Sequence, residues 1–141
     1  MAILSDSDKG KLRQMLSSLK KPVTLVNFTQ ELECPTCRET RWLLEEVSQL
    51  SDRIRLDVFN FITDKDKAAS YGVDKIPATV IVGEKDRGIR IYGMPSGYEF
   101  MTLIEGIQMV ASGDSGLAPQ TRERLSQLTE PVHIQVFVTP T

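Results

Sequence analysis

The chain has 141 residues, of which 40% are hydrophobic and 26% are charged, and its formal net charge is −2. This length is enough for one domain with a buried core, and the composition is typical of a globular protein. The charge balance excludes a strongly basic protein that would bind nucleic acid or an anionic membrane. No apolar run is long enough to span a membrane, and residues 1–8 lack the features of a secretion signal. We therefore expect a cytoplasmic protein.

The first predicted elements are a helix and a strand. Apolar side chains recur at helical spacing over residues 8–20, which predicts an amphipathic helix that ends before Pro22. Residues 23–28 are mostly apolar and rich in branched side chains, so we expect a buried strand there. A loop over residues 29–33 follows. The two cysteines follow this predicted helix, strand and loop.

The only two cysteines, Cys34 and Cys37, enclose Pro35 and Thr36 at the start of the next predicted helix. Proline is favoured at the first position of a helix, where unpaired N–H groups and the helix dipole stabilise an anion. We therefore predict that Cys34 is the nucleophilic thiolate and that Cys37 resolves the mixed disulfide. Arg38 adds a positive charge at i+4 from Cys34.

Other uses of the two cysteines remain as alternatives. Two thiols and the distant His133 are too few for a four-ligand zinc site, which leaves a zinc-bridged dimer as the metal alternative. A structural disulfide across so short a loop would add little stability. Two buried and inert thiols are a further alternative. The expected position at a helix start favours redox chemistry, with no metal and no cofactor.

The remaining elements alternate between strands and helices. Residues 54–58 and 89–91 alternate in polarity and predict strands, and residues 76–82 predict a second buried strand. Residues 64–71 predict a short helix, and residues 100–110 predict a longer one. This order predicts an α/β fold in which a mixed central sheet is covered by helices on both faces.

Three further residues have both a functional and a structural interpretation. Asp57, on a predicted strand, is a candidate proton acceptor near the dithiol, or else it lies on a solvated face. His133 is more typical of a solvent-facing strand residue than of a catalytic base, and Trp42 is more typical of a packing residue. Residues 83–88 are expected to connect two strands and not to bind phosphate, because no helix follows them.

The arrangement resembles the thioredoxin fold with an extra N-terminal helix. The dithiol segment, residues 34–37, is similar to that of the glutaredoxins, and residues 76–79 are similar to the cis-proline segment of the fold family. Residues 93–100 resemble a segment of the protein disulfide oxidoreductases of thermophilic prokaryotes, which consist of two tandem thioredoxin-like units. The N-terminal domain of the alkyl hydroperoxide reductase flavoproteins is similar as well.

The resemblance implies a dithiol–disulfide oxidoreductase that acts on protein disulfides. It also implies that Pro77 follows a cis peptide bond and faces the dithiol, and that Ile76, Pro35 and Thr36 belong to the substrate site. The alternative is a docking or electron-relay module of a larger redox system. In that case its partner would be a flavin-dependent reductase or a component of a peroxide reductase.

The resemblance further divides the chain into two parts. Residues 1–116 correspond to one thioredoxin-like unit, and residues 117–141 resemble the linker helix and the first strand of a second unit. Within this extension, residues 119–128 predict a helix and residues 132–138 alternate in polarity as a strand does. The second dithiol of the family would follow Thr141. We expect the strand to pair within the chain or with a second copy, which gives a monomer or a strand-paired dimer.

Overall fold

The computed structural model describes residues 2–139, and its secondary structure follows the predicted alternation. In chain order the elements are α1 (Asp6–Leu16), β1 (Val23–Thr29), α2 (Cys37–Ser48), β2 (Ile54–Asn60), α3 (Lys65–Ser70), β3 (Ala78–Val82), β4 (Asp86–Tyr92), α4 (Tyr98–Ser112) and α5 (Pro119–Ser126). The predicted order of the first eight elements is therefore confirmed.

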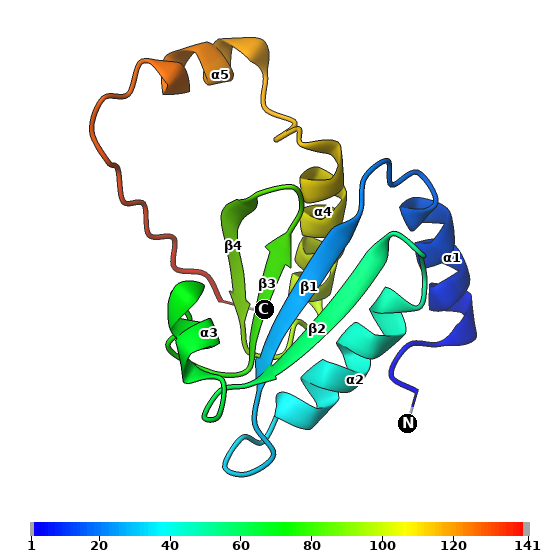
Figure 1. Ribbon diagram of the computed structural model, residues 1–141. Coiled ribbons are helices and arrows are strands. Elements are labelled where there is room, and N and C mark those ends of the chain that lie inside the picture. Colours follow the sequence, from blue (N-terminus) through cyan, green and yellow to red (C-terminus); the bar gives the residue numbers. More distant parts are fainter. Residues whose placement is uncertain (1, 140–141) are drawn as a thin grey trace.

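The strands form one mixed sheet with the order β2-β1-β3-β4 (Figure 1). Strand β1 lies parallel to β2 and antiparallel to β3, and β3 lies antiparallel to β4. Helices α1, α2 and α4 contribute to the core on one face of the sheet, and α3 contributes to the core on the other. The predicted architecture, a mixed sheet covered on both faces, is confirmed.

Strand β1 lies in the interior of the sheet, which explains its nearly continuous apolar sequence. The core between the sheet and helices α1, α2 and α4 is the larger of two, and the core on the α3 face is the smaller. Val23 and Leu25 point into the larger core, whereas Val26 and Phe28 point into the smaller core. In the smaller core the rings of Phe28 and Phe59 stack with 5.7 Å between their centroids. The larger core consists of Leu12, Leu16, Leu19, Val23, Leu25, Leu43, Leu44, Val47, Leu50, Ile54, Ile81, Leu103, Ile104, Ile107 and Ala111.

Helix α1 begins and ends earlier than the predicted range of residues 8–20. Its start is set by Ser5, whose side chain accepts a hydrogen bond from the Asp8 N–H at 3.1 Å. At the other end, the hydroxyls of Ser17 and Ser18 donate to carbonyl oxygens of the last turn. These side-chain hydrogen bonds satisfy carbonyls that a longer helix would otherwise pair with its own N–H groups.

The strand predicted over residues 132–138 does not form. Its side chains are exposed, with exposed fractions of 79% for Ile134 and 90% for Phe137. Helix α5 has no buried residue, and the chain after it is extended and joins none of the strands of the sheet (Figure 1). An alternating pattern creates an apolar face, but a strand also needs a neighbouring ladder, and residues 2–139 provide none for this segment. Among residues 2–139 the segment therefore pairs with no strand, and its pairing with a second copy stays a prediction.

A helix that crosses a bilayer needs about 20 consecutive and mostly apolar residues. None of the helices formed by residues 2–139 combines this length with the required apolar character.

Candidate active site

Cys34 and Cys37 are joined by a disulfide, with 5.5 Å between their Cα atoms. The bonded pair lies immediately after the loop that leaves β1 and at the start of α2. Helix α2 begins at Cys37 and not at Pro35 as predicted, because residues 35–36 form a turn in which the Cys37 N–H donates to the Cys34 carbonyl at 3.4 Å. Cys34 therefore precedes the first helical residue and lies next to the N-terminus of the helix.

The two cysteines of the disulfide differ in their exposure. Cys37 is only 1% exposed, since it belongs to the inward face of α2. Cys34 is partly exposed and lines a cavity of about 710 Å³. A molecule approaching from solvent can therefore contact Cys34 but not Cys37.

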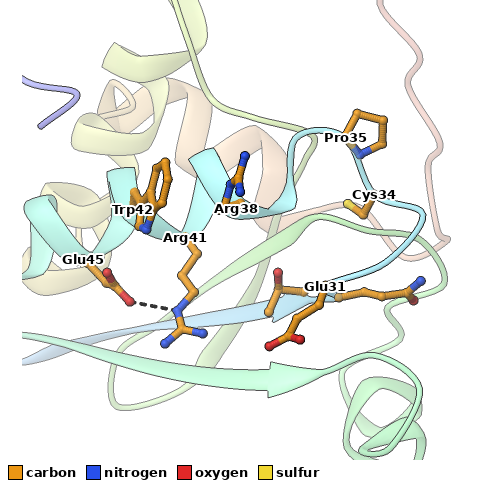
Figure 2. A pocket seen from close by; sticks show the side chains of 9 residues that line it. Glu31, Cys34, Pro35, Arg38, Arg41, Trp42 and Glu45 are labelled. Carbon is orange, nitrogen blue, oxygen red and sulfur yellow. Dashed lines mark hydrogen bonds and ion pairs between the residues drawn. The ribbon is translucent and has the colours of Figure 1, made fainter. Parts of the chain in front are cut away.

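The cavity beside Cys34 is built from the end of β1, the following loop and one face of α2 (Figure 2). Four of its residues are spaced at i, i+3, i+4 and i+7 along α2, the spacing that places side chains on one face of a helix. Its lining consists of Thr29, Gln30, Glu31, Cys34, Pro35, Arg38, Arg41, Trp42 and Glu45. This helical spacing is the sequence signal that would have revealed the cavity wall.

Trp42 forms part of the cavity wall and is only partly buried. The guanidinium carbon of Arg38 lies 5.2 Å from the centroid of the Trp42 ring, which is a cation–π geometry. The Trp42 ring therefore holds the positively charged guanidinium of Arg38 in the wall of the cavity that Cys34 lines. The predicted packing role of Trp42 is incomplete, because its side chain also borders the candidate active site.

Charges of both signs surround the cavity. Arg41 donates from Nε to Glu45 Oε1 at 2.8 Å, so these two residues form an ion pair within the wall. The Arg38 side chain is 74% exposed, and its one ion pair among residues 2–139 is with Glu39, at the long distance of 4.0 Å. Glu31 is exposed and has neither a hydrogen bond nor an ion pair from its carboxylate within the described residues.

The proline segment, residues 76–77, lies at the same end of the central strands as the loop that leads to the dithiol, because β3 begins where the antiparallel β1 ends. The Ile76–Pro77 peptide bond is cis, and Pro77 is buried. The next residue, Ala78, pairs with Phe28 near the end of β1. The Pro77 carbonyl accepts the N–H of Gly93 at 2.9 Å, which connects the proline to the segment after β4.

The predicted site residues thus separate into two groups. Cys34 and Pro35 line the cavity together, and Thr36 is exposed between the two cysteines without lining it. Ile76 and Pro77 lie at the neighbouring strand end and do not line the cavity. Any substrate chain that contacts both groups must therefore extend from the dithiol toward the start of β3.

Two buried polar residues were not identified from the sequence. Asn27 and Thr79 face each other across β1 and β3, and both are fully buried. The Asn27 amide donates to the Ala78 carbonyl at 3.1 Å. Asn27 Oδ1 and Thr79 Oγ1 have no hydrogen-bond partner among the described residues. A polar side chain within the apolar run of residues 23–28 was the available signal.

The remaining candidates lie away from the cavity. Asp57 accepts a hydrogen bond from Arg55 Nε at 2.7 Å, and its register partner Val26 belongs to the core on the α3 face. Its position favours the solvated-strand interpretation. His133 lies in the exposed C-terminal segment. Residues 2–139 contain no group of three or more His, Cys, Asp or Glu side chains placed to hold a metal ion.

Comparison with known proteins gives structural neighbours only. No protein-family model matches the sequence, and no curated protein matches it. A protein disulfide oxidoreductase from Aeropyrum pernix superposes with a TM-score of 0.81 at 27% identity, covering 91% of this chain and 56% of that chain. An alkylhydroperoxide reductase chain from Enterococcus faecalis gives a TM-score of 0.76 at 24% identity, covering 90% of this chain and 62% of that chain.

Smaller proteins share the same architecture. A thioredoxin mutant from Halobacterium salinarum superposes with a TM-score of 0.54 at 15% identity, covering 83% of this chain and 91% of that chain. At this identity the likeness concerns the fold alone. The chain itself spans between half and two thirds of the length of the two larger neighbours.

Proposed function

We propose that this chain, a thioredoxin-fold protein, is a thiol–disulfide oxidoreductase that acts on protein disulfides. One observation carries the proposal: Cys34 borders a cavity, whereas its disulfide partner Cys37 is 1% exposed. An external sulfur can reach only one member of the pair. Exchange therefore has a fixed order, in which one thiol attacks and the other resolves.

The exchange begins from the reduced dithiol. The Cys34 thiolate attacks one sulfur of a substrate disulfide, which forms a mixed disulfide and releases the other substrate sulfur as a thiolate. Cys37 then loses its proton and attacks Cys34 Sγ, which releases the second substrate sulfur and forms the Cys34–Cys37 disulfide seen here. Two electrons pass from the protein to the substrate. The N-terminus of α2 and the Arg38 guanidinium are placed to stabilise the attacking thiolate.

The substrate chain is proposed to run between the dithiol and the proline segment. Pro35 and Thr36 are exposed beside the cysteines, so they can contact a bound chain. The backbone at Ile76 immediately precedes the cis peptide bond to Pro77 and lies outside the β3 ladder. We propose that this backbone pairs with the substrate, while Pro77 shapes the groove.

The redox unit is proposed to comprise residues 1–116, and residues 117–141 are proposed to be an extension that resembles the start of a second unit. The buried core supports this division, because its last member is Ala111. Helix α5 contributes no buried residue.

The proposal is tested by the reduction of insulin in the presence of dithiothreitol. The chain should accelerate insulin precipitation, and C34S should abolish the acceleration. C37S should instead retain substrates as stable mixed disulfides on Cys34, because no second thiol can release them. Equal rates of alkylation of the two cysteines by iodoacetamide in the reduced protein would contradict the assignment of roles.

An electron-relay module is the second candidate function, with a specific observation in its favour. The E. faecalis neighbour belongs to an alkylhydroperoxide reductase, and 90% of this chain superposes on it. A relay module would exchange electrons with one fixed partner, such as a flavin-dependent reductase. It would leave insulin reduction at the rate of dithiothreitol alone, and that result would favour the relay over the general oxidoreductase.

A further inference from the structure

The cavity beside Cys34 has the volume of a small-molecule site. Its volume of about 710 Å³ falls within the range of roughly 300–1,000 Å³ that is usual for ligand pockets. A disulfide of low molecular weight could therefore enter the cavity as a whole and present a sulfur to Cys34.

The charges of the lining indicate what such a molecule would carry. Arg41 and Glu45 neutralise each other through their 2.8 Å ion pair. Two charged groups are then left for a ligand: Arg38 on α2 and Glu31 on the loop (Figure 2). Arg38 is positioned by Trp42 and presents hydrogen-bond donors that suit a carboxylate. Glu31 presents acceptors that suit an ammonium group.

We propose that this cavity binds disulfides whose two halves are amino-acid zwitterions, of which cystine is the simplest. Arg38 binds the α-carboxylate and Glu31 binds the α-ammonium group of the half that lies in the cavity. The inference rests on the proposed thiol–disulfide exchange and assigns it a class of small substrate. Because the two recognition groups come from different elements, a ligand with only one of the charges engages only half of the site.

The reaction follows the same two steps as for a protein substrate. The Cys34 thiolate bonds to one cystine sulfur and the cystine S–S bond breaks, which releases one cysteine thiolate. Cys37 then gives its proton to the released cysteine thiolate or to water, bonds to Cys34 Sγ and releases the second cysteine as a thiolate. Cystine is reduced by two electrons to two cysteines, and the protein dithiol is oxidised to the Cys34–Cys37 disulfide. A dithiol reductant such as dithiothreitol restores the reduced protein.

The test compares three disulfides on the pre-reduced full chain. Cystine carries both charges, cystine dimethyl ester lacks the carboxylates, and N,N′-diacetylcystine lacks the ammonium groups. Oxidation of the protein is followed by the fluorescence of Trp42, the only tryptophan, which borders the cavity. Each rate constant is divided by that of free dithiothreitol with the same disulfide, which corrects for the chemistry of the leaving group. We expect each corrected rate for a modified disulfide to be about tenfold lower than that for cystine.

Two variants separate the two recognition groups. R38Q should remove the preference of cystine over its dimethyl ester and leave the preference over N,N′-diacetylcystine. E31Q should do the reverse. Matched controls are E33Q, a carboxylate on the same loop, and R53Q, an exposed guanidinium; neither residue lines the cavity. Because Arg38 also lies beside the thiolate, ratios between disulfides are compared, and a uniform change in reactivity cancels.

The outcomes distinguish this inference from the proposed function. Equal corrected rates for the three disulfides, together with normal insulin reduction, would overturn the zwitterion site and leave the oxidoreductase proposal in place. A cystine preference that survives in both R38Q and E31Q would also overturn it. Failure to reduce either insulin or cystine would reject both the proposed function and this inference.

Discussion

Glu46 lies on α2, the helix that begins at Cys37, and it connects this helix to the N-terminal segment. Substitution of Glu46 tests this connection. Its carboxylate accepts hydrogen bonds from the N–H groups of Ile3 and Leu4 and forms a 2.9 Å ion pair with Lys9. The Glu46 side chain is 13% exposed. Burial by itself raises the pKa of Glu46, but the hydrogen bonds from Ile3, Lys9 and Leu4 outweigh it, so the pKa lies below its ordinary value of 4.5.

The substitution E46Q keeps the shape of the side chain but removes its charge and one backbone acceptor. We expect a loss of about 1 kcal/mol for the unpaired N–H group and up to about 1 kcal/mol for the partly exposed ion pair. The free energy of unfolding should therefore fall by about 2 kcal/mol at pH 7. For a domain of this size, that corresponds to a decrease in Tm of about 7 °C.

The lowered pKa of Glu46 determines how the stability difference between E46Q and the parent chain changes with pH. A carboxyl group whose pKa is lowered by folding stabilises the folded state above its unfolded pKa, and this contribution disappears as the pH falls through the folded pKa. The difference between E46Q and the parent chain should thus be largest at neutral pH and shrink steadily below about pH 4.5, the ordinary pKa of the group.

Urea denaturation followed by circular dichroism, at pH 7 and at several lower pH values, measures this difference. E105Q is the matched control, since Glu105 is an exposed carboxylate on α4 with no ion pair among the described residues. Its effect should stay within about 0.5 kcal/mol. An E46Q chain as stable as the parent at pH 7, or a difference that does not change with pH, would refute the attachment described here.

Three further predictions concern stability. T79V should stabilise the chain by about 1 kcal/mol in urea denaturation, because it removes a buried hydroxyl without a partner; marked destabilisation would show that the hydroxyl is bonded. G113A should destabilise it by about 1 kcal/mol in the same assay, since Gly113 ends α4 at φ 68°, where a Cβ is strained; an unchanged midpoint would argue against this. Truncation after Leu128 should change neither the Tm nor the alkylation rate of Cys34, because residues 129–139 are exposed; a large change in either would show that the segment packs in solution.

The sequence by itself determined the order of the elements and the identity of the redox pair. Residues 23–28 could be identified as a buried strand because a strand in the interior of a sheet must be apolar on both faces. The cysteine pair could be identified because the spacing of Cys34 and Cys37 places both at one helix start, whatever the rest of the fold. These are local patterns, and local physics is enough to interpret them.

Only the tertiary structure decided which side chains meet at the site. The i+4 spacing placed Arg38 near Cys34, but only the tertiary structure shows that Glu31, from the loop after β1, lines the same cavity. The face on which Asp57 lies depends on its register with Val26 across two strands. The segment 132–138 has the pattern of a strand but no ladder beside it, because pairing is a property of the neighbour and not of the segment itself.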